Sequence, residues 1–155
     1  MRSESTEPKE VTVIEGGLSV DDRGSLAFAN GFGFTGVKRF YKLTNHSTDV
    51  IRAWHGHLRE GKYVYVVRGA IILGAVKLDD VKNPSKQTKV QRFVLSDQKP
   101  ALVFIPPGHA NGFRCLVPDT HVVYFSTSSL EESKGDDYRF PADYWGEQVW
   151  QVENR

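Results

Sequence analysis

The residues from Lys62 to Leu78 read KYVYVVRGAIILGAVKL. Two runs within this stretch, YVYVV (63–67) and AIILGAVKL (70–78), are rich in β-branched and aromatic residues, which suit the pleated surface of a sheet. Gly69 lies between the two runs, where a turn favours a residue without a side chain. The stretch therefore predicts two consecutive β-strands.

Short runs of the same kind extend through most of the chain. They alternate with clusters of Gly, Pro, Asp and Asn, such as DDRG, NGFG and PPGHANG, which mark turns. No long segment shows the period of an amphipathic helix. The further expected strands are 11–14, 25–28, 37–43, 50–54, 89–95, 101–105, 112–117 and 121–126. We therefore predict an all-β fold, for which a double-sheet jelly roll is the natural candidate at this size.

The segment from Glu131 to Arg155 has a different composition. It is acidic at its start and aromatic further on, with the sequence PADYWGEQVW near its end. We expect a short helical or irregular C-terminal segment. It should lie across the mouth of a sheet or against a neighbouring subunit.

Length and charge limit the possible partners. The chain has 155 residues and a net charge of +1, so no strong field favours nucleic acid or an anionic membrane. No apolar run approaches the ~20 residues that span a bilayer. We expect a single domain over residues 11–155 that follows a flexible polar tail, residues 1–10. The tail lacks the apolar core of a signal peptide. Cys115 is the one cysteine. These features predict a cytoplasmic protein that binds small molecules or another copy of itself.

The densest polar cluster is RAWHGHLREGKYVYVVRG (52–69). His55 and His57 are two residues apart, a spacing that puts both side chains on one face of a strand. Lys62 opens the next expected strand. The cluster therefore predicts two imidazoles and an ammonium on neighbouring strands.

The HxH spacing is similar to the first motif of metal-binding cupins, and PPGHAN (106–111) is similar to their second motif. Lys62 stands where those proteins carry a glutamate ligand, and Asn111 stands where they carry a histidine. An ammonium in that position repels a divalent cation. We therefore expect neither a metal ion nor another cofactor.

Without a metal, these residue types favour proton transfer next to a carbonyl group. Such chemistry needs a base, a cation or donor at the enolate oxygen, and an acid. Histidine supplies the base, and Lys62 is suited to stabilise the enolate. Tyr124 on the opposite wall is suited to return the proton to the other face. His109, which follows the Pro-Gly turn, is expected at the mouth of the barrel.

Seven segments in order resemble the dTDP-4-dehydrorhamnose 3,5-epimerase family. They are DDRGSL (21–26), RAWHGH (52–57), the Lys62 to Gly69 step, NPS to FVLS (83–96), FIPPGHANGF (104–113), VVYFS (122–126) and PADYWGEQVWQVE (141–153). The resemblance implies a metal-free, cupin-type double-stranded β-helix that forms a homodimer. It also implies an isomerase that takes a nucleotide sugar and acts in deoxysugar synthesis.

The resemblance assigns roles residue by residue. It implies that His55 is the general base, that Asp143 orients it, and that Tyr124 protonates the opposite face of the sugar. It places Lys62 beside the keto oxygen. The expected product is a dTDP-4-keto-6-deoxy sugar that is epimerised at C3, at C5 or at both.

Further matches and departures concern substrate binding. Arg52 resembles an arginine near the phosphates, and Arg23 resembles one that reaches the nucleotide across the dimer. Where the family continues after that arginine with an aromatic residue and an acid, this chain has Leu26 and Phe28. We also place His109 among the substrate-binding residues.

His57 and Asn111 stand where epimerases usually carry Gln and His, and Asn111 is expected to contact substrate. An HxH pair is a feature of the related dTDP-4-keto-6-deoxyhexose 3,4-ketoisomerases, which the stretch from VKRFYKL to RAWHGH also resembles. A 3,4-ketoisomerase is therefore the second hypothesis. A non-catalytic cupin that binds a sugar nucleotide is the third, and a metal-dependent cupin oxygenase is the fourth.

Overall fold

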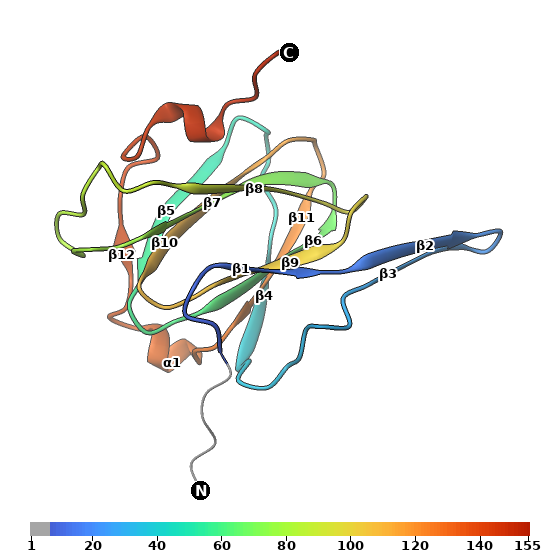
Figure 1. Cartoon of the computed structure of the whole chain (residues 1–155), viewed down its shortest axis with the longest axis horizontal. Coiled ribbons are helices and arrows are strands. Elements are labelled where there is room, and N and C mark those ends of the chain that lie inside the picture. The colour runs from blue at the N-terminus through green and yellow to red at the C-terminus, as the bar shows by residue number, and fades with distance from the viewer. Residues whose placement is uncertain (1–6) are drawn as a thin grey trace, which may run out of the picture.

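The computed structural model describes residues 7–155. Two five-stranded antiparallel sheets face each other, and a two-stranded hairpin extends from them (Figure 1). The first sheet has the order β1 (Thr12–Glu15), β9 (Ala101–Ile105), β6 (Lys62–Arg68), β11 (His121–Ser126) and β4 (Arg39–Leu43). The second has the order β12 (Tyr138–Arg139), β5 (Ile51–His57), β10 (His109–Cys115), β7 (Ala70–Lys77) and β8 (Gln91–Ser96). The predicted all-β, cupin-type jelly roll is confirmed.

Each strand expected from the sequence is present, with ends that differ by up to three residues. β10 begins earlier than expected because the turn-like residues Asn111 and Gly112 lie inside it. Gly112 lies so close to Ala53 that a side chain would clash, which explains a glycine within a strand. Of the expected tail, residues 1–6 lie outside the described residues, and Glu7 lies beside Gly61.

Apolar side chains fill most of the space between the two sheets. They come from both sheets, because the side chains of each strand alternate between the interior and the outside. The members are Val64, Val66, Ile71, Leu73, Ala75, Leu95, Ala101, Val103, Ile105, Phe113, Cys115, Val122 and Tyr124. Burying each large apolar side chain contributes about 1.5–3 kcal/mol.

The C-terminal segment covers the outer face of the second sheet. Trp54 on β5 is fully buried there and contacts the rings of Trp145 and Trp150. The indoles of Trp54 and Trp150 both donate to the carbonyl oxygen of Ala142. Gly74 of β7 lies under two of these rings, and a Cβ there would clash with them. The expected C-terminal segment therefore packs on its own sheet, and only β12 joins a sheet edge.

The C-terminal part of the chain contains two short helices. The helix α1 (Leu130–Ser133) begins with a capping box between Ser129 and Glu132, and η1 (Glu147–Trp150) is a single 3₁₀ turn. Together they confirm the expected short helical part of the C-terminus. Within residues 7–155, neither helix has the length or the apolar character to cross a membrane.

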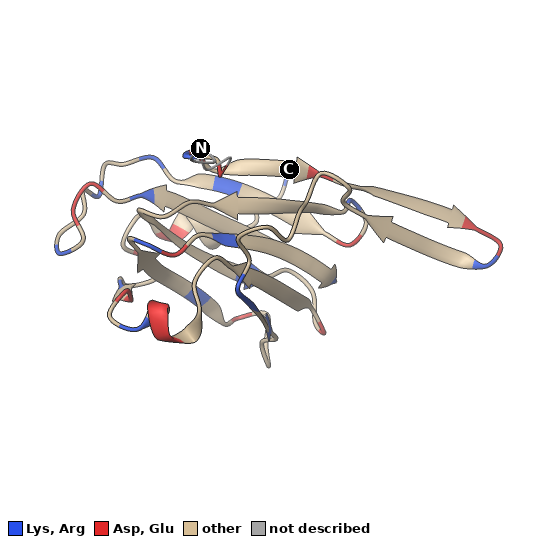
Figure 2. Cartoon of the chain, turned by 90° about the horizontal axis from the view of Figure 1, so that it is seen from below, with Lys and Arg blue, Asp and Glu red and all other residues tan. Residues whose placement is uncertain are grey.

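The hairpin of β2 (Gly17–Asp21) and β3 (Gly24–Phe28) extends away from the two sheets (Figure 1). The sequence did not predict β2, since its side chains are mostly exposed and show no buried face. Val20 is 70% exposed and Leu26 is 64% exposed, so neither of these apolar side chains is covered within one chain. The charges of the hairpin lie at its tip (Figure 2).

Candidate active site

Polar side chains gather at one end of the space between the sheets. There they surround a cavity of about 290 Å³. The lining residues are Arg39, Tyr41, His55, His57, Glu60, Lys62, Ser133, Asp137 and Arg139. Two walls of this cavity belong to the two sheets, and the segment around α1 and β12 forms its rim.

One wall is formed by β5, which pairs with β10. His55 pairs with Asn111, and His57 pairs with His109, so the four side chains share one face of the sheet. Asn111 donates to the carbonyl oxygen of His55. The ring of His109 instead contacts the carbonyl oxygen of Pro107 at 3.2 Å, and His109 does not line the cavity. The expected pair of imidazoles on one face is therefore present.

The facing wall is formed by β6, β11 and β4. Lys62 pairs with Ser126, and Ser126 pairs with Arg39 in one row across the three strands. In the next row, the rings of Tyr124 and Tyr41 stack with their centres 5.4 Å apart. The Lys62 ammonium lies 5.4 Å from the ring centre of Tyr124 and 5.8 Å from that of Tyr41. An ammonium thus lies above two phenols.

The two tyrosines face different surroundings. Tyr124 is buried, and its hydroxyl donates to the side-chain oxygen of Asn111 at 3.2 Å. Tyr41 lines the cavity, although the sequence analysis did not single it out. Burial raises the pKa of both phenols, so both keep their protons at neutral pH. The sequence carried no local signal for Tyr41, because β4 and β6 come together only through β11, which lies between them in the sheet.

Glu60 is a second residue that the sequence analysis missed. It is 3% exposed, and its carboxylate accepts from Arg39 at 3.1 Å and from the Ser126 hydroxyl at 2.7 Å. The other carboxylate oxygen lies 3.5 Å from the Lys62 ammonium. Burial lowers the pKa of Lys62, and the charge of Glu60 opposes that effect. Glu60 therefore compensates the buried charge of Lys62 and the half-buried charge of Arg39 in the wall of the cavity.

His57 has one bonded and one free ring nitrogen. Its Nδ1 bonds to the carbonyl oxygen of Asp136, and a carbonyl can only accept, so Nδ1 carries the proton. Its Nε2 is buried and has no hydrogen-bond partner among the described residues, with a Glu60 carboxylate oxygen 3.8 Å away. Burial, followed by the charge of Lys62, lowers the pKa of His57. The ring is therefore a neutral base whose lone pair is buried at the cavity.

His55 also has a lowered pKa. Burial is the largest cause, followed by the charges of Lys62 and Arg139, whereas Asp137 acts in the opposite direction. Asp137 and Arg139 form an ion pair at 3.1 Å beside β12, on the rim of the cavity. A neutral imidazole at this position is suited to accept a proton.

Asp143 does not approach His55. The chain leaves β12 for the outer face of the second sheet, where Ala142 binds the tryptophan indoles. Asp143 is exposed there and lines a different groove, together with Arg114 and Trp150. The carboxylate that acts on His55 is that of Asp137.

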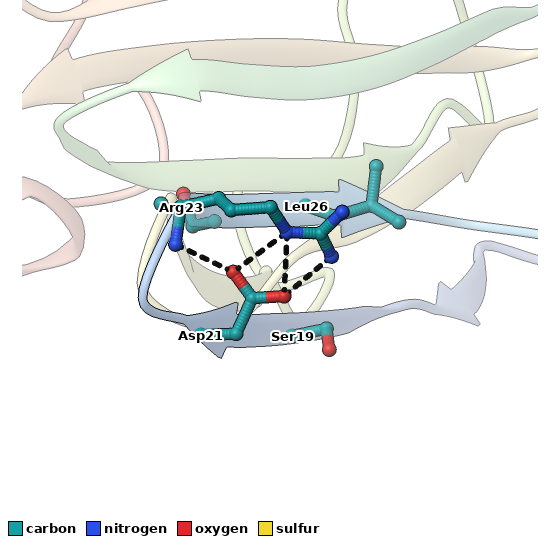
Figure 3. Close-up of a pocket in the computed structure, with 6 residues that line it drawn as sticks. Ser19, Asp21, Arg23 and Leu26 are labelled. Carbon is teal, nitrogen blue, oxygen red and sulfur yellow. Dashed lines mark hydrogen bonds and ion pairs between the residues drawn. The ribbon is translucent and has the colours of Figure 1, made fainter.

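Neither expected phosphate-binding arginine lines the cavity in a single chain. Arg23 lies at the tip of the hairpin and forms a bidentate ion pair with Asp21 (Figure 3). Arg52 donates to the side chain of Asn45 and to the carbonyl oxygen of Thr44. Across residues 7–155, no group of three or more His, Cys, Asp and Glu side chains could hold a metal ion.

Sequence comparisons identify the family of this chain and one relative. The family model of dTDP-4-dehydrorhamnose 3,5-epimerase matches residues 5–141. The chain is similar to SpsL of Bacillus subtilis, a spore coat polysaccharide biosynthesis protein, with 31% identity over 97 residues. That match covers 61% of this chain and 62% of SpsL, less than two thirds of the relative.

Solved structures share the fold. The dTDP-4-dehydrorhamnose 3,5-epimerase of Bacillus anthracis, solved with TDP and PPi bound, superposes with a TM-score of 0.71 at 21% identity, over 96% of this chain and 90% of that chain. The sugar 3,4-ketoisomerase QdtA of Thermoanaerobacterium thermosaccharolyticum, solved with TDP, gives 0.64 at 18% identity, over 88% and 93%. Because the family model spans most of the sequence, this chain belongs to the dTDP-4-dehydrorhamnose 3,5-epimerase family of sugar-nucleotide isomerases.

Proposed function

We propose that the protein epimerises a dTDP-4-keto-6-deoxy sugar at C3, at C5 or at both, in deoxysugar synthesis for a surface polysaccharide. One observation carries the proposal: two imidazoles and the Tyr41 phenol lie on facing walls of one cavity, and the Lys62 ammonium lies above the stacked rings of Tyr41 and Tyr124. Inversion of a carbon centre requires removal of a proton from one side and its return from the other. A sugar ring held between these walls meets that requirement.

In the first half of the reaction, His55 removes the proton next to the ketone. Its lowered pKa keeps it neutral near pH 7, as a base must be. The electrons of the broken C–H bond form an enolate, whose charge develops on the C4 oxygen. The Lys62 ammonium stabilises that charge in a site from which protein groups exclude much of the water.

In the second half, a phenol on the facing wall returns a proton to the same carbon from the opposite side. We assign this step to the stacked pair of Tyr124 and Tyr41. Tyr124 is the member that the family resemblance implies, and Tyr41 is the member that lines the cavity. Their raised pKa values keep both in the protonated form that an acid needs.

A 3,4-ketoisomerase is the second candidate, because His55 and His57 lie on the same wall. A ketoisomerase moves a proton from C3 to C4 on one side of an enediol, and two imidazoles on one face suit that transfer. The free Nε2 of His57 is the specific feature that favours it.

We further infer a homodimer, since Val20 and Leu26 of the hairpin are exposed in one chain. A second copy that covers this hairpin would also bring Arg23 to a nucleotide bound in the partner. The Asp21 ion pair would then exchange for contacts with the diphosphate. Size-exclusion chromatography with light scattering tests this inference, and a monomer at micromolar concentration would contradict it.

Incubation with dTDP-4-keto-6-deoxyglucose in D₂O, followed by proton NMR and mass spectrometry, tests the reaction. Deuterium at C3 or C5 with inverted configuration supports the epimerase. A product with its carbonyl at C3 supports the ketoisomerase instead. The absence of exchange at every carbon would overturn both candidates.

The same assay separates the two tyrosines. Phenylalanine at the position of the proton donor should allow deuterium exchange from the histidine side while preventing inversion. We expect this result for Tyr41→Phe or for Tyr124→Phe. Tyr65→Phe, on the outer face of β6, is the matched control and should behave as the wild type. Inversion at the wild-type rate in both Tyr41→Phe and Tyr124→Phe would contradict the assignment.

A further inference from the structure

Asp136 is a buried carboxylate that lies between α1 and β12, and it is 1% exposed. Its two oxygens accept three consecutive backbone N–H groups of the turn after β5. Leu58 donates at 2.7 Å, Arg59 at 3.0 Å and Glu60 at 3.1 Å. A single side chain therefore fixes the backbone of the whole turn that joins β5 to β6.

The main chain of the same residue fixes the ring of His57. The carbonyl oxygen of Asp136 accepts from Nδ1, so the proton cannot occupy Nε2 in the neutral ring. Nε2 then carries the lone pair, and it is the buried ring nitrogen that has no partner in the described part of the chain. The contact therefore determines which nitrogen of His57 can act as a base.

Glu60 extends the effect of Asp136 to the facing wall. Its backbone N–H binds the carboxylate of Asp136, and its own carboxylate contacts Lys62 and Arg39. Movement of the turn would move Glu60 and with it the charge that faces the Lys62 ammonium. The His57 ring on one wall and the charge that faces the Lys62 ammonium on the other thus depend on one anchoring residue.

We propose that Asp136 is a positioning residue, which sets the tautomer of His57 through its carbonyl oxygen and the place of Glu60 through its carboxylate. This inference rests on the proposed function of the cavity. It assigns a role to a residue outside the cavity lining. The positioning role also explains why Asp136 is buried beside this turn. Its carboxylate replaces the water molecules that the backbone N–H groups would otherwise bind.

The tautomer is measured directly by long-range ¹H–¹⁵N correlation NMR of the histidine rings, without substrate. In the wild type we expect His57 to carry its proton on Nδ1 and to remain neutral at pH 7. Asp136→Asn keeps the backbone carbonyl, but its amide cannot accept all three N–H groups. We therefore expect the turn that follows His57 to shift, the contact between Nδ1 and the carbonyl to weaken, and the ring to populate both tautomers. Asp97→Asn is the matched control, because Asp97 also accepts a backbone N–H, that of Gly69, but lies away from the cavity.

Turnover gives the second readout. Displacing a catalytic group by about 1 Å costs up to about 100-fold in rate, so we expect Asp136→Asn to lower kcat by about 10- to 100-fold with little change in KM. Asp97→Asn should leave kcat unchanged. A merely structural role would lower the amount of folded protein without moving the His57 signals or the kcat of the folded fraction.

The outcomes separate this inference from the proposed function. A His57 ring in the wild type with its proton on Nε2 would overturn the positioning role, even if Asp136→Asn failed to fold. Unchanged ring signals in Asp136→Asn would do the same. A wild type that fails to turn over or exchange the sugar would instead overturn the proposed function, while the NMR result would still stand.

Discussion

The two faces of β5 carry different parts of the molecule. On the inner face, His55 and His57 border the cavity together with polar and charged side chains of the facing wall. On the outer face, Trp54 is fully buried among Trp145, Trp150 and the C-terminal segment. Because side chains alternate along a strand, the six residues RAWHGH supply a reactive surface and a structural anchor at once.

One strand thus carries the proposed catalytic histidines on one face and a buried apolar anchor on the other. The backbone of β5 is held by β10 on one side and by β12 on the other. The tryptophans pack on the outer face of the sheet. We infer that the part of the C-terminal segment after β12 stabilises this wall and supplies no carboxylate to His55, whereas Asp137, before β12, acts on that ring. The following predictions test this division, from the largest effect to the smallest.

Replacing His55 with glutamine should have the largest effect on activity. Loss of a general base lowers kcat by about 10²–10⁴-fold, and the half-buried ring makes few contacts that stability depends on. Turnover of the sugar nucleotide and urea unfolding are the measurements. His46→Gln, at an exposed turn, is the control. Near-normal turnover of the His55 variant would show that the base lies elsewhere.

Replacing Trp54 with alanine tests the opposite face. Truncation of a fully buried tryptophan costs about 3–5 kcal/mol of unfolding free energy, and the indole also loses its bond to Ala142. The folded fraction should keep much of its activity, in contrast to the His55 variant. Val67→Ala, on a side chain that is 52% exposed, should change stability by less than about 0.5 kcal/mol. A Trp54→Ala variant that is as stable as the wild type would contradict the structural role of the outer face of β5.

The strands and the inner face of β5 could be predicted from sequence, because alternation and turn residues are local signals. His55, His57 and Lys62 lie within one such stretch, on two strands that are consecutive in the sequence, so their proximity could be expected. Glu60 and Asp136 could not be predicted in this way. Their roles arise from a contact between residues 76 positions apart, and no pattern of hydrophobicity marks it.

The same lack of a local sequence signal explains why Asp143 was expected beside His55, where the structure places Asp137. Several acids occur in the C-terminal part, and the sequence does not say at which residue the chain passes from the cavity to the outer face. Asp137 precedes β12 and stays at the rim, whereas Asp143 follows it and does not. A resemblance that matched the PAD segment could therefore identify the family without identifying the acid beside His55.

Replacing Glu60 with glutamine should have an intermediate effect. The variant loses charge-assisted contacts with Arg39 and Lys62, which are worth about 1–3 kcal/mol in stability. Glu60 raises the pKa of Lys62, so the loss of Glu60 lowers that pKa. Lys62 then loses its proton at a lower pH, and the alkaline limb of the pH–rate profile should move to lower pH. A pH–rate profile measures the shift. Glu132→Gln, which removes an exposed ion pair with Lys38, should leave the profile unchanged.

Acidification should lower the free energy of unfolding gradually, and by less than the Glu60→Gln substitution. The pKa values of His55, His57 and His109 are lowered from 6.5, with burial as the largest cause. Below about pH 6.5 the unfolded chain therefore binds more protons than the folded chain, and stability falls as the pH decreases. Thermal unfolding between about pH 5 and pH 8 measures this. His57→Gln should show a weaker pH dependence, and a stability that is constant across this range would contradict the lowered values.

Replacing Asp143 with asparagine should have the smallest effect of all. Its carboxylate is exposed on the outer face, so its loss should leave the acid limb of the pH–rate profile in place and change kcat by less than about threefold. Asp137→Asn is the matched comparison, because Asp137 raises the pKa of His55. Without that carboxylate the pKa of His55 falls, and the acid limb should move to lower pH. If the Asp143 variant instead loses activity as severely as the His55 variant, then the two faces of β5 are coupled. The C-terminal segment would then reach the reacting sugar, either within this chain or in a second copy.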